Sequence, residues 1–397
     1  MDVHDFAVIG AGIAGASVAY ELQARGRTIL LEREPLPGQH TTGRSAAFLV
    51  ESYGKPLVQK LTRGGRRFLE KPPEGFVSYP VLTPRPVMWV AREDQREQLQ
   101  ARLEAARASG AQLELVSAAR ARELCPVLRE GYVAAAALES NSMSIDVAGL
   151  LDAFLRGFRA RGGTVHTRAE VTALLRVGHA WEICAGGEVY RAPVVVNAAG
   201  AWCDEVAALA GARSVGLQPL RRTAIVFNAP PGFDVRSWPC VIDADEDFYL
   251  KCEGARLLAS PCDEVPSPPC DPTPEDYGVA LAAERIQRAT SLEIRHIQRR
   301  WAGLRSFVAD RAPVIGMDPE QPGFFWLAGQ GGFGIMTCSA AARSAASLIV
   351  DGKLPPDLEA QGLTPEALSP ARLGDVVRPA HPESADADSS SRIRPSS

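Results

Sequence analysis

Three glycines near the N-terminus have the spacing of a turn that binds phosphate. Gly10, Gly12 and Gly15 follow a short apolar run, residues 6–9, and open a segment of small residues with helical periodicity, residues 14–25. The first glycine permits a tight turn, the second lets a pyrophosphate approach the backbone, and the third lets the helix pack closely on the strand. Because free N–H groups at a helix start attract phosphate, the motif predicts a dinucleotide site.

The carboxylate of Glu32 stands where a dinucleotide site needs a ribose ligand. Glu32 follows a second apolar strand, residues 28–31, roughly 20 residues after Gly10. A carboxylate at this place accepts hydrogen bonds from the ribose hydroxyls and repels a 2′-phosphate. The strand, the helix and Glu32 together predict a Rossmann-like unit that holds an adenine dinucleotide.

Other segments could reach the same ligand. In the loop at residues 38–48, four polar side chains could contact phosphates or a ring system, although a polar surface loop is the alternative: Thr41, Thr42, Arg44 and Ser45. The pattern of residues 164–175 predicts one strand. This strand could present its backbone to an adenine, or it could have a structural role only. Residues 194–206 repeat the pattern of strand, small-residue turn and helix start. A glycine-rich turn at residues 329–334 precedes an alanine-rich helix that could point its N-terminus at a ligand.

These elements predict an α/β fold with two interleaved domains, because 397 residues exceed a typical single domain. Short alternating strands in residues 218–260 indicate an α+β substrate domain of mainly antiparallel β-sheet capped by helices. We expect a Rossmann-like dinucleotide domain from residues 1–50, 141–215 and 305–372, and a substrate domain from residues 51–140 and 216–304. The remainder, residues 373–397, is polar and is expected to be a disordered tail.

Composition excludes several classes of protein. The formal charge of −4 gives no electrostatic footprint for nucleic acid. The eight cysteines have no C-x-x-C spacing and form no ligand cluster with histidine, so we expect reduced thiols and no metal. Neither an export signal nor an apolar run of roughly 20 residues is present. We therefore expect a cytoplasmic protein without a transmembrane segment, and peripheral contact with the inner face of a membrane stays open.

Five motifs occur in the order seen in the D-amino-acid oxidase (DAO) superfamily of FAD-dependent oxidoreductases. They are the opening glycine motif, HTTGRSAA at 40–47, VVVNAAGAW at 194–202, WAGLRSFVAD at 301–310 and WLAGQGGFGI at 326–335. Within this superfamily the chain most resembles the bacterial FAD-dependent D-arginine dehydrogenases, over about residues 3–372. The resemblance implies noncovalent FAD and an FAD domain threaded through a substrate domain.

The resemblance also implies which residues hold FAD. The first set is expected to bind FAD, with no part of the cofactor specified: Gly10, Gly12, Ile13, Ala14, Gly15, Glu32, Arg33, Thr42, Gly43, Ser45, Ala46, Ala47, Val171, Ala199, Gly200 and Trp202. The second set lies near the flavin ring: Gly303, Arg305, Gly331, Gly332, Phe333, Gly334, Ile335 and Thr337. Backbone N–H groups at the second glycine turn would stabilise the negative charge of a reduced flavin.

For the substrate, the resemblance implies a carboxylate clamp of Arg222 and Arg305, with Tyr53 and Tyr249 as further catalytic-site residues. A guanidinium suits a carboxylate because two parallel charge-assisted bonds fix its position and orientation. From the residues alone, Arg222 beside Arg221 is typical of surface charge, whereas Arg305 lies among apolar residues. The implied reaction at the CH–NH₂ group is hydride transfer from the α-carbon to flavin N5. The resulting imine is hydrolysed to a 2-oxo acid and ammonia.

Two positions depart from the D-arginine dehydrogenase pattern. Val87 stands where those enzymes have a glutamate for the substrate guanidinium, and Phe48 replaces a histidine. A buried cation facing valine and phenylalanine would lose its hydration without gaining a partner. The resemblance also places Cys240, Ile242 and Gly332 against the substrate, so we expect a hydrophobic pocket. A neutral D-amino acid, apolar or aromatic, is the predicted substrate.

Several alternatives stay open. The first is an oxidase of glycine or of N-methylamino acids such as sarcosine, or an amine-oxidising enzyme of a specialised pathway. The second is a noncatalytic flavoprotein, which the retained clamp arginines disfavour. An NAD-dependent dehydrogenase is disfavoured by the C-terminal glycine turn. Oxygen, a quinone or another carrier could accept the electrons, and the chain is expected to be a monomer or a weak oligomer.

Overall fold

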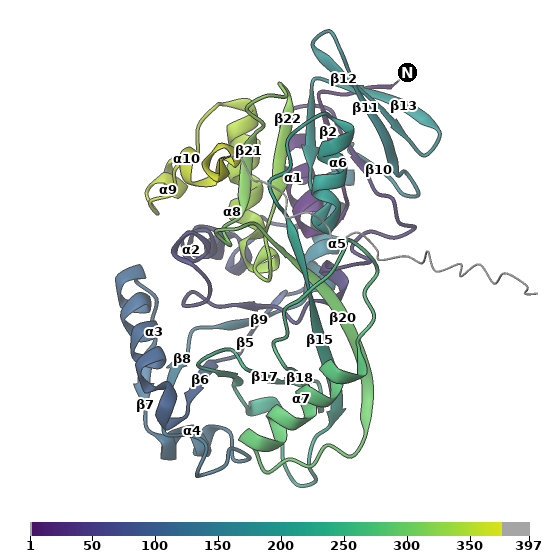
Figure 1. The fold of residues 1–397 in the computed structure, drawn as a ribbon. Helices are drawn as coiled ribbons and strands as arrows, with labels where there is room; N and C mark the ends of the chain where they lie inside the picture. Colours follow the sequence, from purple (N-terminus) through teal and green to yellow (C-terminus); the bar gives the residue numbers. More distant parts are fainter. Residues whose placement is uncertain (1, 375–397) are drawn as a thin grey trace, which may run out of the picture.

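A mainly parallel sheet forms the centre of one half of the molecule, the upper half in Figure 1. In the computed structural model, which describes residues 2–374, its strands lie in the order β10 (Thr164–His166), β3 (Thr28–Leu31), β2 (Phe6–Ile9), β14 (Val194–Asn197), β22 (Phe324–Ala328) and β21 (Val314–Met317). All pair in parallel except β21, which is antiparallel to β22. Strands β2, β3 and β22 are continuously apolar because both faces of the sheet are covered.

Helices cover one face of this sheet, and a smaller sheet with one helix covers the other. The helical side contains α1 (Ile13–Gln23), α2 (Pro56–Glu70), α5 (Val147–Ala160) and α8 (Gly334–Val350). The other side contains β1 (Asp2–Val3), β11 (Val171–Val177), β12 (Ala180–Ala185), β13 (Glu188–Ala192) and α6 (Cys203–Leu209). The C-terminal ends of β2, β3 and β14 therefore meet at one edge, where α1 begins.

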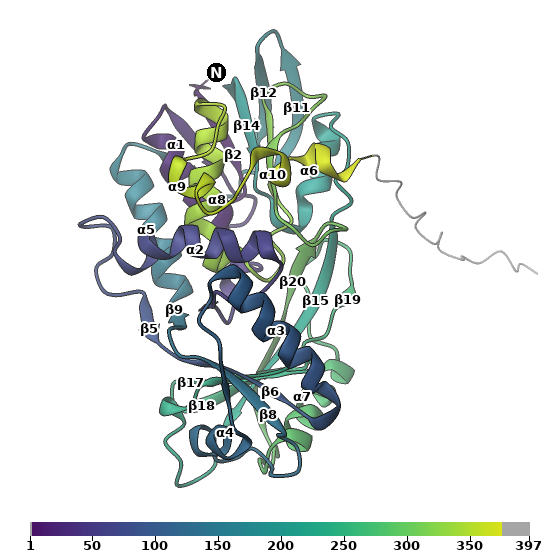
Figure 2. The same cartoon turned by 90° about the vertical axis from the view of Figure 1, so that its left-hand side faces the viewer.

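Small residues let α8 pack closely against its neighbours. Ala340 of α8 is completely buried, and a Cβ added to Gly65 of α2 would lie 3.3 Å from the Ala340 backbone nitrogen. Glycine at position 65 therefore permits the close crossing of α2 and α8 that Figure 2 shows. Two short helices, α9 (Pro356–Glu359) and α10 (Pro365–Leu368), follow α8.

The other half of the molecule is built on a mixed, mainly antiparallel sheet. Its strands lie in the order β19 (Val265–Pro266), β15 (Gln218–Asn228), β18 (Arg256–Ser260), β17 (Tyr249–Glu253), β16 (Cys240–Asp243), β6 (Val87–Ala91), β8 (Ala135–Glu139) and β7 (Glu114–Val116), and β20 (Ile297–Phe307) also pairs with β15. Within this mixed sheet, only the β16–β6 pairing is parallel among the strands that the structure describes. The long pair β15 and β20 reaches up to the first sheet in Figure 1.

Helices pack on both faces of this mixed sheet. On one face, α4 (Ala118–Leu124) and α7 (Asp276–Ala289) cover a core that includes Met88 and Val241. On the opposite face, α3 (Arg96–Ser109) covers Val87 and Trp89. A short sheet of β4 (Phe48–Leu49), β9 (Met143–Ile145) and β5 (Leu82–Pro84) lies between the two halves in Figure 1.

The predicted α/β fold class is confirmed, and one local prediction is wrong. Residues 164–175 form two strands in different sheets, because the chain turns at Arg168, whose φ is 55°. Val171 therefore opens β11 instead of ending a strand. The predicted tail lies outside the described residues from residue 375 onward. Each helix within residues 2–374 is too short or too polar to cross a bilayer.

Candidate active site

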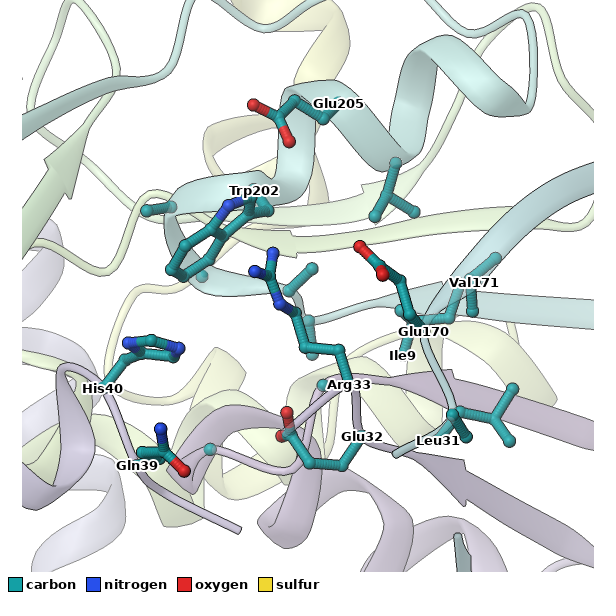
Figure 3. Close-up of a pocket in the computed structure, with 18 of the residues that line it drawn as sticks. Ile9, Leu31, Glu32, Arg33, Gln39, His40, Glu170, Val171, Trp202 and Glu205 are labelled. Atoms are coloured by element: carbon teal, nitrogen blue, oxygen red, sulfur yellow. The ribbon is translucent and has the colours of Figure 1, made fainter. Parts of the chain in front are cut away.

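A cavity of about 410 Å³ lies at the edge where β2, β3 and β14 end; we call it the adenine-side cavity (Figure 3). Many predicted cofactor residues line it: Gly10, Gly12, Glu32, Arg33, Thr42, Val171, Ala199, Gly200 and Trp202. The start of α1 faces this space; its Ile13 N–H donates to the Thr42 hydroxyl at 3.0 Å, and the N-cap residue Gly12 has no side chain that could cap the other N–H groups of the first turn. Its free N–H groups and the positive end of its dipole are therefore available to an anion such as a pyrophosphate.

The three glycines of the opening motif have different structural roles. Gly10 has a φ of 97°, and a Cβ there would lie 2.6 Å from the Ala198 carbonyl oxygen. A Cβ on Gly15 would collide with the Gly10 carbonyl oxygen at 1.7 Å. A Cβ on Gly12 would meet only the Thr42 hydroxyl oxygen, at 3.2 Å, and would otherwise enter open space. Gly10 and Gly15 are thus required by the turn itself, whereas Gly12 leaves room for a ligand.

Glu32 is buried and fixed by the backbone of the same turn. Its carboxylate accepts hydrogen bonds from the Ala11 N–H at 2.7 Å and from the Glu34 N–H at 2.9 Å. The side chain is 7% exposed and lines the cavity. Each carboxylate oxygen can accept a further bond, so this geometry fits a ribose hydroxyl.

Aromatic and charged side chains form the outer wall of the adenine-side cavity. The Arg33 guanidinium lies 4.5 Å from the centre of the Trp202 ring, and His40 packs on the same ring at 4.7 Å. His40 also contacts the Glu34 carboxylate at 2.9 Å. Figure 3 shows Arg33 between Trp202 and Glu170. These planar groups provide stacking surfaces for an adenine ring.

A second cavity, of about 90 Å³, shares Thr41 and Thr42 with the first; we call it the clamp cavity. Predicted cofactor-binding and substrate-binding residues from distant parts of the chain line it: Ile13, Ser45, Ala46, Ala47, Arg222, Tyr249, Gly303, Arg305, Gly331, Gly332, Gly334 and Ile335. The glycine turn before α8 and the two clamp arginines are therefore brought together. A cofactor that extends from one cavity into the other would place its reactive end beside these arginines.

The pairing of β15 with β20 positions the two arginines. Arg222 lies opposite Gly303, and Arg305 lies opposite Leu220, so the arginines are diagonal neighbours on one face of the sheet. Glycine at position 303 leaves the space beside Arg222 free of a side chain. A Cβ on Gly332 would lie 2.8 Å from the Arg305 guanidinium carbon, so the glycine turn packs directly on this arginine.

Arg222 has one N–H group left for a ligand. Its Nε donates to the Asp263 carbonyl at 2.8 Å, and Nη2 donates to the Glu264 carboxylate at 3.1 Å. Its Nη1 is buried and has no partner among residues 2–374. A buried donor without an acceptor is costly, so this atom indicates that a ligand oxygen binds here.

Arg305 keeps its charge although it is buried. Burial lowers its pKa, but the nearby Tyr53 and Tyr249 hydroxyls raise it, and the net effect is an increase above the ordinary value. No carboxylate in the described part of the chain forms an ion pair with Arg305. Its guanidinium can therefore bind the carboxylate of a ligand.

The two predicted tyrosines are neutral hydrogen-bond donors. Burial raises the pKa of Tyr53 and of Tyr249 to about 12 in each case. The Tyr53 hydroxyl donates to Glu246 at 3.2 Å, and Glu246 also accepts from Arg102 at 3.4 Å. Because both hydroxyls stay protonated at neutral pH, neither can act as a general base there.

Other predicted residues lie outside the lining of both cavities. Val87 and Cys240 are covered, at 0% and 1% exposed, in a cluster against which Phe48, Tyr53 and Ile242 pack. The other predicted residues support the site through packing or backbone contacts. Ala14 and Gly15 lie in α1, and Gly43 packs against the Gly38 carbonyl. The Phe333 ring lies between Tyr53 and Phe307, and the Thr337 hydroxyl donates to the Phe333 carbonyl. Arg44, in contrast, is part of the lining of the clamp cavity, although its guanidinium also binds Asp271 and two backbone carbonyls.

Two residues beside the clamp, Cys262 and Glu264, were not predicted from the sequence. Glu264 accepts from Arg222 and also from Arg311, whose guanidinium lies 3.8 Å from the centre of the Phe307 ring. The Cys262 thiol lies in the field of both clamp arginines, yet burial raises its pKa to about 11. Both residues come from the loop after β18, a Pro- and Asp-rich stretch that sequence patterns mark only as a connection.

Comparison with known proteins agrees with this geometry. Residues 5–348 match the model of the DAO family, FAD dependent oxidoreductase. The chain is 25% identical over 373 residues to the uncharacterised oxidoreductase YurR of Bacillus subtilis, covering 89% of this chain and 96% of YurR. It is 25% identical to human mitochondrial sarcosine dehydrogenase, covering 88% of this chain and 40% of that enzyme.

The fold matches that of solved flavoenzymes. The structure of L-proline dehydrogenase from P. horikoshii superposes with a TM-score of 0.81 at 22% identity, covering 94% of this chain and 98% of that one. The predicted relation to D-arginine dehydrogenases in particular is not tested by these matches. The family match spans both cavities and the clamp. The chain therefore belongs to the DAO family of FAD-dependent oxidoreductases, and its cofactor is FAD.

Proposed function

We propose that this protein oxidises the Cα–N bond of an amino acid whose side chain is not a cation. The substrate that the sequence predicts first is a neutral D-amino acid with an apolar or aromatic side chain. The observation that carries the proposal is the buried, unpartnered Nη1 of Arg222 beside the unpaired guanidinium of Arg305. Two guanidinium groups can bind the two oxygens of one carboxylate and fix its orientation.

A carboxylate held by these arginines would lie next to the glycine turn that packs on Arg305. The residues of the two cavities would hold FAD without a covalent bond, and FAD would supply there the acceptor for the hydride that leaves the α-carbon. The neutral Tyr53 and Tyr249 hydroxyls would hold the substrate without taking its proton. The amine therefore has to lose its proton before oxidation, and its lone pair then drives formation of an imine, which water hydrolyses to a 2-oxo acid and ammonia.

The residues around the clamp disfavour a cationic side chain. Position 87 carries a buried valine, and Phe48 and Ile242 pack against the same cluster. A guanidinium or ammonium that entered this region would find apolar surface where a carboxylate is needed. D-Arginine and D-lysine are therefore expected to be poor substrates.

A smaller substrate is the second candidate. The clamp cavity, at about 90 Å³, is smaller than the adenine-side cavity, which favours a small amino acid. The similarity to sarcosine dehydrogenase also favours glycine or an N-methylamino acid. Oxidation of these substrates would use the same clamp and the same cofactor.

Anaerobic reduction of the bound flavin tests the proposal. The purified protein is mixed with D-, L- and N-methylamino acids, and loss of the oxidised flavin absorbance is followed over time. We expect neutral D-amino acids to reduce the flavin faster than D-arginine and D-lysine. The proposal is wrong if no amino acid in the panel reduces the flavin. Mixing the reduced protein with air or with a quinone then identifies the electron acceptor.

A further inference from the structure

A lysine lies on the face of the mixed sheet that carries the predicted substrate residues. Val87 of β6 pairs with Cys240 of β16, and Ile242 pairs with Tyr249 of β17. One step further along the antiparallel β16–β17 pair, Lys251 lies opposite Cys240. Because paired residues project from the same face, Val87, Cys240 and Lys251 form one row across three strands.

Lys251 is buried beside the clamp cavity. The residue is 8% exposed, and its ammonium lies 5.3 Å from the centre of the Phe48 ring. Phe48 follows Ala47 in the chain, and Tyr249 lies two residues before Lys251; both Ala47 and Tyr249 line the clamp cavity. Neither Lys251 nor Phe48 lines the cavity itself, but each lies within two residues of one that does.

One carboxylate pairs with Lys251, and it is accessible to solvent. The Glu253 carboxylate lies 3.1 Å from the lysine nitrogen, and its side chain is 51% exposed. The other nearby acids are engaged elsewhere. Glu139 accepts from the backbone N–H groups of Glu51 and Ser52, and Glu246 accepts from Tyr53 and Arg102.

We infer that Lys251 selects a substrate whose side chain ends in a carboxylate. The inference rests on the proposed oxidation of an amino acid whose side chain is not a cation, and it ranks a second, distal carboxylate above the neutral side chains predicted from the sequence. Arg222 and Arg305 would hold the α-carboxylate, and Lys251 would bind the distal one in place of, or together with, Glu253.

A comparison of isosteric substrates tests this inference. D-Glutamate and D-glutamine have nearly the same shape and differ in the charge of the side-chain end. We expect kcat/KM for D-glutamate to exceed that for D-glutamine by about tenfold, because only the carboxylate forms a charge-assisted bond with Lys251. Lys251→Met should remove this preference, and Glu253→Gln, which frees the ammonium, should increase it. Lys71→Met, at an exposed lysine after α2, is the matched control and should leave the ratio unchanged.

Binding of an unreactive dicarboxylate separates this inference from the proposed function. Glutarate and its monoamide are titrated into the FAD-bound protein, and the shift in the flavin spectrum gives the dissociation constants. Tighter binding of glutarate that Lys251→Met and Lys251→Gln both abolish supports the inference even if no amino acid reduces the flavin. The inference is overturned if the parent binds both ligands equally, prefers D-glutamine, or keeps its preference without Lys251.

Discussion

Glu264 holds the buried clamp arginine through a carboxylate that it shares with a second arginine. It accepts from Arg222 at 3.1 Å and from Arg311 at 2.7 Å. Both arginines lower the pKa of Glu264 against the effect of burial, so the carboxylate stays charged at neutral pH. Because Glu264 touches the clamp and not the substrate, it is a positioning residue. Its removal should loosen the orientation of the Arg222 guanidinium without changing the chemical step.

We therefore expect Glu264→Gln to raise KM for the best amino acid about tenfold and to change kcat less than threefold. Arg305→Met removes a direct charge-assisted contact of about 1.5 to 3 kcal/mol and should lower kcat/KM by roughly tenfold to a few hundredfold. Steady-state kinetics measures both effects. Glu123→Gln, which breaks an exposed ion pair with Arg120 on α4, is the control. An unchanged KM in Glu264→Gln would show that Arg222 is positioned by its other contacts.

The raised pKa values of Tyr53 and Tyr249 make a prediction about pH. Both hydroxyls have a pKa of about 12, above the ordinary value of 10, so each remains protonated as the pH rises from 7 to 11. The rate of flavin reduction should therefore increase over this range only as the substrate amine loses its proton. Tyr249→Phe should lower the rate and leave the midpoint of this pH profile in place. A midpoint that moves in the variant would identify the tyrosine as the titrating group.

At the scale of elements, the contact between α2 and α8 connects core packing with the cofactor site. Ala340 is completely buried where α8 crosses Gly65, and the turn that begins α8 lines the clamp cavity. Ala340→Leu adds volume to a closely packed contact and should reduce the free energy of unfolding by about 1 to 3 kcal/mol. Displacement of α8 should also weaken FAD binding. Thermal unfolding and flavin content measure the two effects, with the exposed Ala360→Leu as control. Unchanged stability would mean that the helices separate at little cost.

At the scale of the whole molecule, the walls of the adenine-side cavity come from distant parts of the chain. Residues 9–12, 31–42, 169–172 and 198–209 all contribute. A ligand that contacts all four segments stabilises the folded state by mass action, by about 2.7 kcal/mol at a hundredfold excess over its dissociation constant. Excess FAD should therefore raise the melting temperature of the apoprotein. Gly12→Val, which fills the open space at the turn, should lose this response and its flavin, whereas Gly131→Ala, with no neighbour within 4 Å, should retain both. Normal flavin content in Gly12→Val would exclude this turn as the phosphate site.

Local motifs could be predicted from the sequence, whereas contacts set by sheet register could not. Gly10, Gly12 and Glu32 lie within one strand–helix–strand unit, and their roles follow from short-range spacing. The clamp arginines were found only through the family resemblance, because β15 and β20 pair directly in the sheet but are separated in the sequence by β16 to β19 and α7. The burial of Lys251 depends on the pairing of β17 with β16, and the contact of Glu264 depends on the path of a loop. Neither the burial of Lys251 nor the contact of Glu264 corresponds to a motif or a periodicity in the sequence.

Strand β20 contributes both to the carboxylate clamp and to the support of the cofactor turn. Arg305 lies under Gly332, and two residues later the Phe307 ring packs so tightly that a Cβ on Gly331 would collide with it at 2.0 Å. Mutations in this strand would disturb the redox centre together with substrate binding, so evolution has little freedom there. The wall formed by β6 and β16 contributes no residue to the lining of the clamp cavity. Laboratory evolution directed at that wall alone should generate enzymes for new amino acids that retain the ancestral chemistry.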